Sequence, residues 1–326
     1  MELFMRCTVE NNMISTNEIL DSLEYVHKNS KFVSIDSAAI DAFVARFSPT
    51  QPTSWAEIYP LGYKKRANDD DELDFLFLTF SQAFCFWGFP EKWKINHKGQ
   101  VLDGWWALVA CFERALENGV PILDGNYLSQ MSLADARSLF QGEPEIPLLE
   151  ERHKILVSIG QTLTHKYDGR IHCFFASTKK DVASLVKNIS REFAGFDDVA
   201  SYHGRKIFFY KKIQVFLSYV KGIENYNQLV GAADYKIPAV LRKLGILVYA
   251  KELADLVDNR IEIPAGSEAE TEIRASDLWA IHLLCEKLNL KWPSIYPATL
   301  DGMLWNISQK KDETDKPYHL TRTIFY

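Results

Sequence analysis

Apolar residues recur every three or four positions along most of the chain, the spacing that places them on one face of an α-helix. In 17–28, for example, Ile19, Leu23 and Val26 share a face, and 37–47 repeats the spacing. The pattern predicts helices at 17–28, 37–47, 103–119, 147–166, 178–193, 235–244, 248–257, 275–288 and 298–308, with two more starting near 69 and 132.

Polar residues mark where several of these helices begin. The acidic run 69–72 precedes an apolar stretch, and negative charge at a helix start interacts favourably with the helix dipole. Asp103 can cap the helix that follows it. Ser132 and Asp135 have the spacing of a capping box, with the shorter Asp in place of Glu.

Strand signals are few. The segment 94–102 predicts a small hairpin that turns at Lys98-Gly99. The segment 206–220 is ambiguous between strand and helix, and 51–68 has the composition of a loop. No internal repeat or linker interrupts the chain. We therefore predict one mostly α-helical domain over 1–326, in one body or in two helical lobes, with a small β element.

Composition narrows the functional classes. With 326 residues, of which 47% are hydrophobic, the chain can bury a large core. Its net charge is −6, whereas proteins that bind duplex nucleic acid usually carry a basic excess. We therefore expect no direct contact with a duplex. A pocket for one small phosphorylated molecule remains compatible with this charge.

Cysteine usage and hydropathy indicate a cytoplasmic protein. The five cysteines include no CxxC pair and are widely spaced, which is typical of reduced thiols. The segment 1–7 lacks the pattern of a signal peptide. The longest uncharged run, 75–90, is shorter than the span of about 20 residues that crosses a membrane. No membrane partner is expected.

The sequence lacks the short motifs that mark several kinds of catalytic or cofactor site. The chain has no HExxH, no P-loop and no nucleophile elbow, so we predict neither a metal site nor a cofactor. His153, in a helix rich in charged residues, is predicted to be exposed or to form a structural hydrogen bond.

Two acids and a basic pair remain as candidates. Asp234 follows two small residues and precedes an amphipathic helix, so it is a helix cap, a ligand-facing carboxylate, or both. Helical spacing places Asp301 and Trp305 on one face. Lys211 and Lys212 follow an aromatic run, which favours a semi-buried position over a fully solvated one.

A set of short motifs in a fixed order covers nearly the whole chain. They are FCFW (84–87), GWW (104–106), PLLEERH (147–153), GRK (204–206), FYKKIQ (209–214), ADYKIP (233–238), EIRA (272–275), LDGMLW (300–305) and HLTRTIFY (319–326). Together they resemble the queuosine salvage family, the queuosine 5′-phosphate N-glycosylases. The resemblance implies a cytosolic, α-helical protein distantly related to helix-hairpin-helix DNA glycosylases. It also implies release of queuine, a 7-deazaguanine base used in tRNA modification, from its nucleoside 5′-phosphate.

The resemblance assigns roles to residues of this chain. Asp234 takes the place of the catalytic aspartate, Asp301 matches an acid that contacts the base, and Lys211 is the candidate for the 5′-phosphate, with Lys212 or Arg322 as alternatives. The remaining substrate-binding candidates are Tyr59, Trp87, Trp106, Ala232, Tyr235, Trp305 and Asn306.

The chain departs from the family pattern at four positions. Tyr59 stands where a His is common, and Ala83 stands where an Asn is common. Ala232 replaces a Phe, and Asn306 replaces an acid. These departures concern recognition of the base, whereas the catalytic aspartate is intact.

The expected chemistry explains the residue types. Cleaving a ribosyl C–N bond builds positive charge on the sugar, and a fixed carboxylate such as Asp234 stabilises it, either electrostatically or by a transient bond. The leading prediction is therefore a nucleotide N-glycosylase. Two alternatives stay open: a binding protein that holds a modified base or nucleotide without turnover, and a DNA base-excision glycosylase.

Overall fold

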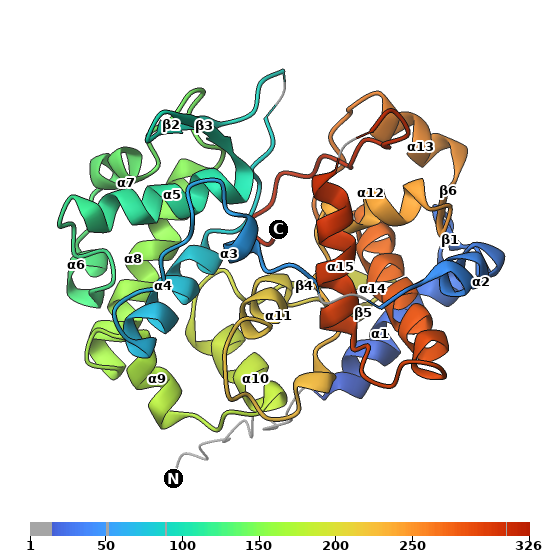
Figure 1. Ribbon diagram of the computed structural model, residues 1–326, viewed down its shortest axis with the longest axis horizontal. Coiled ribbons are helices and arrows are strands. Elements are labelled where there is room, and N and C mark those ends of the chain that lie inside the picture. Colours follow the sequence, from blue (N-terminus) through green and yellow to red (C-terminus); the bar gives the residue numbers. More distant parts are fainter. Residues whose placement is uncertain (1–14, 50–51, 89, 311) are drawn as a thin grey trace, which may run out of the picture.

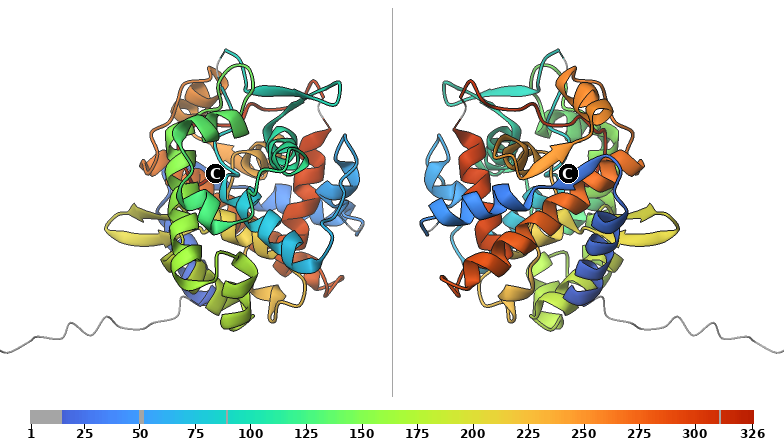
Figure 2. Two further views of the ribbon diagram at one scale, coloured as in Figure 1. Left: turned by 90° about the vertical axis from the view of Figure 1, so that its left-hand side faces the viewer. Right: turned by 90° about the vertical axis from the view of Figure 1, so that its right-hand side faces the viewer.

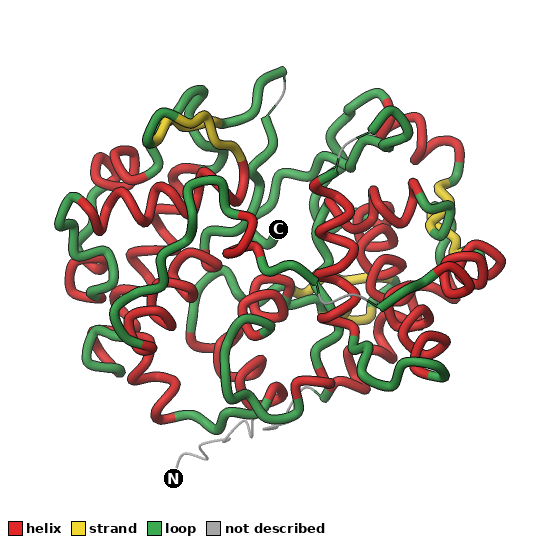
Figure 3. The backbone as a smooth tube through the Cα atoms, viewed as in Figure 1, coloured by secondary structure: helices red, strands yellow, loops and turns green. Residues whose placement is uncertain are grey.

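The computed structural model describes residues 15–49, 52–88, 90–310 and 312–326. Over these residues the chain forms fifteen α-helices, one 3₁₀ turn (η1, Tyr226–Gln228) and three two-stranded sheets. Figure 3 shows how small the share of strand is. The predicted mostly α-helical fold with a small β element is confirmed. The predictions for Cys7 and for 1–7 fall outside the described residues.

The helices form two groups on opposite sides of the molecule (Figure 1). The first group consists of α4 (Asp69–Ser81), α5 (Gly104–Glu117), α6 (Gly125–Ser129), α7 (Leu133–Leu139), α8 (Leu149–Lys166), α9 (Ile171–Ser177) and α10 (Val182–Glu192). The second group consists of α1 (Thr16–Asn29), α2 (Ser37–Arg46), α12 (Lys236–Lys243), α13 (Lys251–Asp258), α14 (Glu268–Asn289) and α15 (Pro297–Gln309). The helices α3 (Trp55–Ile58) and α11 (Lys211–Leu217) lie between the groups in this view.

Each sheet is a pair of short antiparallel strands. The predicted hairpin is confirmed as β2 (Lys94–His97) and β3 (Gln100–Asp103). A second hairpin, β4 (Val199–Tyr202) and β5 (Arg205–Phe208), projects from the body of the protein in Figure 2. The third pair joins distant parts of the chain, β1 (Val33–Ile35) and β6 (Leu247–Tyr249).

Local backbone chemistry explains where the predicted elements differ from the structure. The ambiguous segment 206–220 is both strand and helix, because Tyr210 adopts a left-handed conformation (φ 52°) that separates β5 from α11. The helix predicted from 178 begins at Val182, since the Asp181 side chain caps it. The helix predicted from 248 is wrong at its start, because 247–249 pair with β1. The short helices α3, within the predicted loop, and α9 were not predicted.

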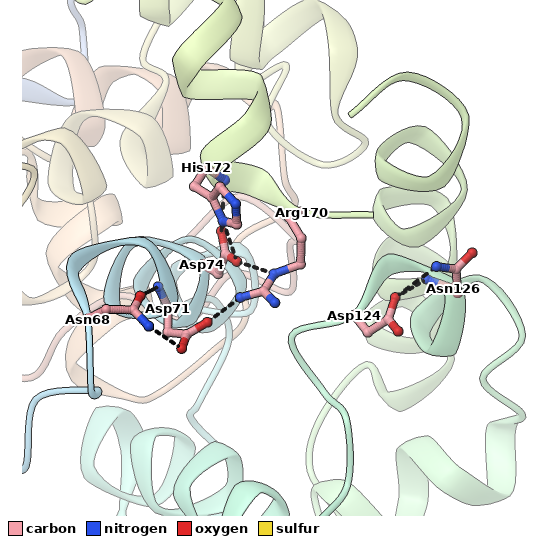
Figure 4. A network of polar contacts seen from close by, with 7 residues as sticks. All are labelled: Asn68, Asp71, Asp74, Asp124, Asn126, Arg170 and His172. Atoms are coloured by element: carbon pink, nitrogen blue, oxygen red, sulfur yellow. Dashed lines mark hydrogen bonds and ion pairs between the residues drawn. The ribbon is translucent and has the colours of Figure 1, made fainter. Parts of the chain in front are cut away.

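The acidic start of α4 carries a polar network that holds α9 (Figure 4). The Asn68 side chain accepts a hydrogen bond from the Asp71 N–H (2.8 Å) and caps the helix, as predicted for a start near 69. The Asp74 carboxylate accepts the Arg170 Nε–H (2.5 Å) and the His172 backbone N–H (2.8 Å). Because the Asp74 side chain is almost fully buried, these bonds fix the packing of α9 on α4.

Three buried basic side chains hold the turn 81–85, which follows α4. Arg152 comes from α8, and Lys211 and Lys212 come from α11. Their hydrogen bonds run from Lys212 Nζ to Ser81 O (2.9 Å), from Arg152 to the carbonyls of Gln82 (2.7 Å), Phe84 and Cys85 (3.3 Å), and from Lys211 Nζ to Ala83 O (3.0 Å). Successive carbonyl groups of the turn are thereby satisfied inside the core.

The C-terminal residue packs against the same turn. The Cys85 N–H donates to the Tyr326 carbonyl (2.8 Å), and the Tyr326 hydroxyl donates to Glu270 of α14 (2.8 Å). Tyr326 is 1% exposed. The turn therefore connects the first helix group to the second through buried polar contacts.

We predict that Arg152→Met lowers the free energy of unfolding by about 2–6 kcal/mol, because the buried carbonyls of Phe84 and Cys85 lose their Arg152 donor and each costs about 1–3 kcal/mol. Urea denaturation followed by circular dichroism measures the change. Arg137→Met is the matched control, since the Arg137 side chain is 56% exposed and pairs with Glu145 at the surface. Equal stability loss in both variants would contradict the structural role of Arg152.

Candidate active site

A pocket opens between the two helix groups, lined by residues of α4, α5, α11, α12 and α15 and of the loops after α4 and before α12. Its aromatic lining residues are Trp55, Phe80, Phe86, Trp105, Trp106, Tyr219, Tyr235 and Trp305. Its charged lining residues are Asp103, Lys211, Asp234, Lys236 and Asp301. An aromatic wall beside two carboxylates and an ammonium group suits a ligand that combines a flat ring with polar groups.

Asp234 lies just before α12 and bonds the start of the helix. Its Oδ1 accepts the backbone N–H groups of Lys236 (2.6 Å) and Ile237 (3.0 Å). The predicted bonds to the helix start are present, but the N-cap residue of α12 is Tyr235, so Asp234 lies one residue before the cap position. Since both bonds go to Oδ1, they do not require Oδ2, and the half-buried carboxylate still faces the pocket. The helix N-terminus favours the negative charge of this group.

Asp301, on α15, reaches the same part of the pocket. Its Oδ1 accepts the Ala232 N–H (3.0 Å). Burial raises the pKa of Asp301 to about 7, and the charge of Asp234 adds to the rise, while the Ala232 N–H and Lys211 oppose it. Asp301 therefore carries its proton for part of the time at neutral pH.

Gly231 permits this approach of the loop to Asp301. Its φ is 101°, a conformation that side chains rarely adopt. A Cβ at this position would also lie 3.4 Å from Asp301 Oδ1 and 3.3 Å from the Leu278 side chain. The Ala232–Asp301 hydrogen bond thus depends on a glycine immediately before it.

Lys211 lies in the pocket wall but points into the protein. It is 8% exposed, and its Nζ donates to the Ala83 carbonyl. Burial lowers the pKa of Lys211, whereas the nearby Asp234 and Asp301 oppose this effect. Its ammonium group therefore balances the carboxylates. The geometry gives no separate support to its predicted phosphate contact.

A buried ion pair positions the loop that carries Asp234. Arg274 of α14 binds Asp198 through two hydrogen bonds (2.9 and 2.7 Å), and each side chain is 3% exposed. Arg274 Nε also donates to the Ala233 carbonyl (3.2 Å), and Asp198 Oδ2 accepts the Lys211 N–H (3.0 Å). One ion pair thus fixes Lys211 and the residue before Asp234. Arg274 belongs to the EIRA motif, but no sequence signal singled out Asp198.

Among the predicted aromatic contacts, Trp106 and Trp305 line the pocket, with ring centroids 5.7 Å apart in an edge-to-face arrangement. Tyr235 and Ala232 line it as well. Ala83 also lines the pocket, and its carbonyl accepts the bond from Lys211 Nζ.

Five predicted binding residues lie outside the pocket lining, and this geometry does not support their direct contact with a ligand. Lys212 is 1% exposed and bonds Ser81, and Trp87 is 2% exposed beneath the Arg322 guanidinium. Arg322 pairs with Glu262 (3.1 Å). The Tyr59 hydroxyl donates to Glu113 (3.1 Å), and the Asn306 amide bonds the backbone of Thr53.

Asp277 is a buried acid that sequence reasoning missed. It is 0% exposed, and neither carboxyl oxygen has a hydrogen-bond partner in the described part of the chain. Burial raises its pKa well above the ordinary value, and the charges of Asp301 and Asp234 add to the rise. Burial of Asp277 therefore disfavours its charged form. In sequence it is one polar residue of a long helix.

The structural role predicted for His153 is confirmed. His153 Nε2 bonds the Met131 carbonyl (2.7 Å), as expected for a structural histidine. Within 15–49, 52–88, 90–310 and 312–326, no group of His, Cys, Asp and Glu residues is arranged to hold a metal ion. No helix in those ranges is long and apolar enough to cross a bilayer.

Comparison with known proteins identifies relatives over nearly the whole chain. A family model described as queuosine salvage protein matches residues 63–326. A protein of Sphaerobacter thermophilus named queuosine 5′-phosphate N-glycosylase/hydrolase is 37% identical over 94% of this chain and 97% of its own length. Proteins of the same name from Mus musculus (29% identical, 94% of this chain and 98% of the relative) and Schizosaccharomyces pombe (25%, 95% and 100%) are also similar.

We predict that Gly231→Ala destabilises the protein by more than the about 1–2 kcal/mol expected from a left-handed conformation alone. The added Cβ also meets Asp301 and Leu278. Gly222→Ala is the matched control, because Gly222 has φ 73° and open space around its Cβ position. Thermal or urea denaturation of both variants gives the comparison, and equal losses would show that the approach to Asp301 is not constrained.

Proposed function

The chain belongs to the queuosine salvage protein family, and we propose on this basis that it hydrolyses the N-glycosidic bond of queuosine 5′-phosphate and releases queuine for salvage. The observation that supports this most directly is the placement of Asp234 and Asp301 in one aromatic pocket, with Lys211 beside them. Both carboxyl groups are anchored by backbone N–H groups, so their positions are fixed before a ligand binds.

Asp234 stabilises the cationic sugar. As the C1′–N bond breaks, its electron pair leaves with the base, and positive charge develops on the ribose. A carboxylate held at a helix start and shielded by an aromatic wall interacts strongly with this charge, since little water screens it. The oxygen of a water molecule then bonds to C1′ and completes hydrolysis.

Asp301 assists departure of the base. A 7-deazapurine has no N7 to protonate, so the leaving base needs a proton or a hydrogen bond elsewhere on its ring. Asp301, with its pKa raised to about 7, is an acid that can donate near neutral pH. The water that attacks C1′ releases a proton, which restores the protonated carboxyl group.

The arrangement of the helices and the net charge support further proposals about the whole protein. Both helix groups line the pocket, which supports one domain over 1–326. An aspartate at a helix start, facing a pocket between helix groups, supports the distant relationship to helix-hairpin-helix DNA glycosylases. The net charge of −6 supports a free nucleotide, and not a nucleic acid duplex, as substrate. We propose a cytoplasmic location, where queuosine nucleotides from RNA turnover are available.

We predict that Asp234→Asn lowers kcat for queuosine 5′-phosphate by about 10²–10³-fold, the size of comparable electrostatic deletions. Asn caps helices as well as Asp, so folding is retained. Asp36→Asn is the control, because Asp36 Oδ1 likewise accepts two backbone N–H groups at the start of a helix, α2, but lies outside the pocket. Mass spectrometry of released queuine gives the rates. Unchanged turnover in Asp234→Asn would exclude this role, and binding without any release by the wild-type protein would favour the binding-protein alternative.

The pH dependence tests Asp301. Only the protonated form donates, so kcat/KM is expected to fall as pH rises above about 7. Asp301→Asn should lower the activity and remove this alkaline decline. A pH–rate profile of both proteins, with recovery of activity checked after return to pH 6, measures the effect. The same alkaline decline in Asp301→Asn would assign it to another group.

A further inference from the structure

A basic groove adjoins the pocket and shares the Lys236 side chain with it. Its basic lining residues are Lys92, Lys236, Lys243, Arg260 and Lys316, and its acidic lining residue is Asp315. The chain as a whole has 43 acidic and 37 basic residues. The groove therefore concentrates positive charge against the overall balance of the protein, directly beside the candidate active site.

Tyr318 gathers three of these cations around one ring. Lys92 Nζ lies 5.9 Å, Lys236 Nζ 5.6 Å and Arg260 Cζ 4.6 Å from the ring centroid. On another side, Tyr318 packs against Tyr235, with centroids 4.9 Å apart, and Tyr235 lines the pocket. Cation–π attraction holds like charges close together, so an anion that binds among them relieves their repulsion.

The acids near the groove only partly offset this charge. Lys243 is paired with Asp312 (2.6 Å) and Asp315 (2.7 Å) and is thereby neutralised. Lys92 lies 3.9 Å from Asp103. Arg260 donates to the Tyr318 carbonyl (3.1 Å) and has no carboxylate partner among the described residues. Arg260 therefore keeps its positive charge available in the groove.

We propose that this groove binds the terminal phosphate of the nucleotide whose sugar lies at Asp234, which rests on the proposed function. Lys236 is two residues from Asp234, and its backbone N–H bonds the Asp234 carboxylate while its side chain borders the groove. A sugar held at Asp234 therefore lies close to a cationic residue that belongs to both the pocket and the groove.

The floor of the pocket is a poorer place for the phosphate. A phosphate monoester carries a charge of about −1.5 to −2 at neutral pH. Beside Lys211 it would face both Asp234 and Asp301, and the Lys211 ammonium group already donates to Ala83. In the groove the phosphate meets several cations and keeps part of its hydration, so the desolvation cost is smaller.

Affinity measurements on an Asp234→Asn background separate this inference from turnover. Titration calorimetry with queuosine and queuosine 5′-phosphate gives the gain in affinity due to the phosphate. We expect a gain of about 10- to 100-fold, the size of one or two charge-assisted hydrogen bonds. In the double variant Asp234→Asn/Lys236→Gln, the phosphate should no longer improve affinity, so the gain should fall to about 1-fold. Lys154→Gln, which changes an exposed lysine of α8 that lines neither the pocket nor the groove, should retain it.

Two further results would contradict the proposed phosphate site. A full gain that persists in Lys236→Gln but is lost in Lys211→Met would place the phosphate at Lys211 and overturn the proposal. If a dinucleotide whose 5′-phosphate is a diester gains as much affinity as the monoester, the groove would be a phosphodiester site, and the proposal of a terminal-phosphate site would be wrong.

Inorganic phosphate tests the groove independently of the base. It should raise the melting temperature of the wild-type protein and of Lys154→Gln more than that of Lys236→Gln. Equal shifts in all three would overturn the site even if queuine release is observed. Conversely, a wild-type protein that releases no queuine but shows the Lys236-dependent shift would refute the proposed function and retain the anion site.

Discussion

The turn 81–85 is the constraint on which the rest of the structure depends. Its carbonyl groups follow the C-terminus of α4, where the helix dipole is negative, and they point into the core. Arg152, Lys211 and Lys212 satisfy them, and none of the three pairs with a carboxylate within 4 Å in the described part of the chain. Because Arg152 comes from α8 and the lysines from α11, folding the turn also fixes these two helices. The same Lys211 that bonds the turn also forms part of the pocket wall, so the site is built on a structural requirement of the core.

The second half of the site is fixed from the opposite helix group. Arg274 and Asp198 form a buried ion pair whose spare donors and acceptors hold Ala233 and the Lys211 backbone. Breaking such a pair would leave an uncompensated charge in the core, which is strongly unfavourable. The pair therefore makes the relative position of Asp234 and Lys211 a property of the folded state, and the glycine at 231 lets the loop reach Asp301.

Sequence patterns predict what depends on neighbours along the chain and miss what depends on distant ones. The start of α4, the 94–102 hairpin and the bonds of Asp234 to the start of α12 follow from local chemistry and are confirmed. The strand at 247–249 exists because it pairs with 33–35, so its local pattern was misleading. Adjacent lysines cannot be told apart in sequence, yet Lys211 lines the pocket and Lys212 lies in the core, because neighbouring helix positions point in different directions. Asp277 carried no signal because its significance comes from burial near two other acids.

The distribution of charge in the pocket explains how three acids can lie close together. Burial raises the pKa of Asp277 well above its ordinary value and that of Asp301 to about 7, so both sites disfavour a second and third negative charge beside Asp234. Lys211 is a cation of the same pocket lining, and the charges of Asp234 and Asp301 both favour its ammonium form. When positive charge develops on the sugar, its attraction to Asp234 is stronger than that of the neutral sugar in the ground state, so the interaction favours the transition state. A dianionic phosphate on the floor would cancel this advantage by repelling Asp234, which is a physical reason for the cationic residues of the protein to gather outside the pocket, around Tyr318.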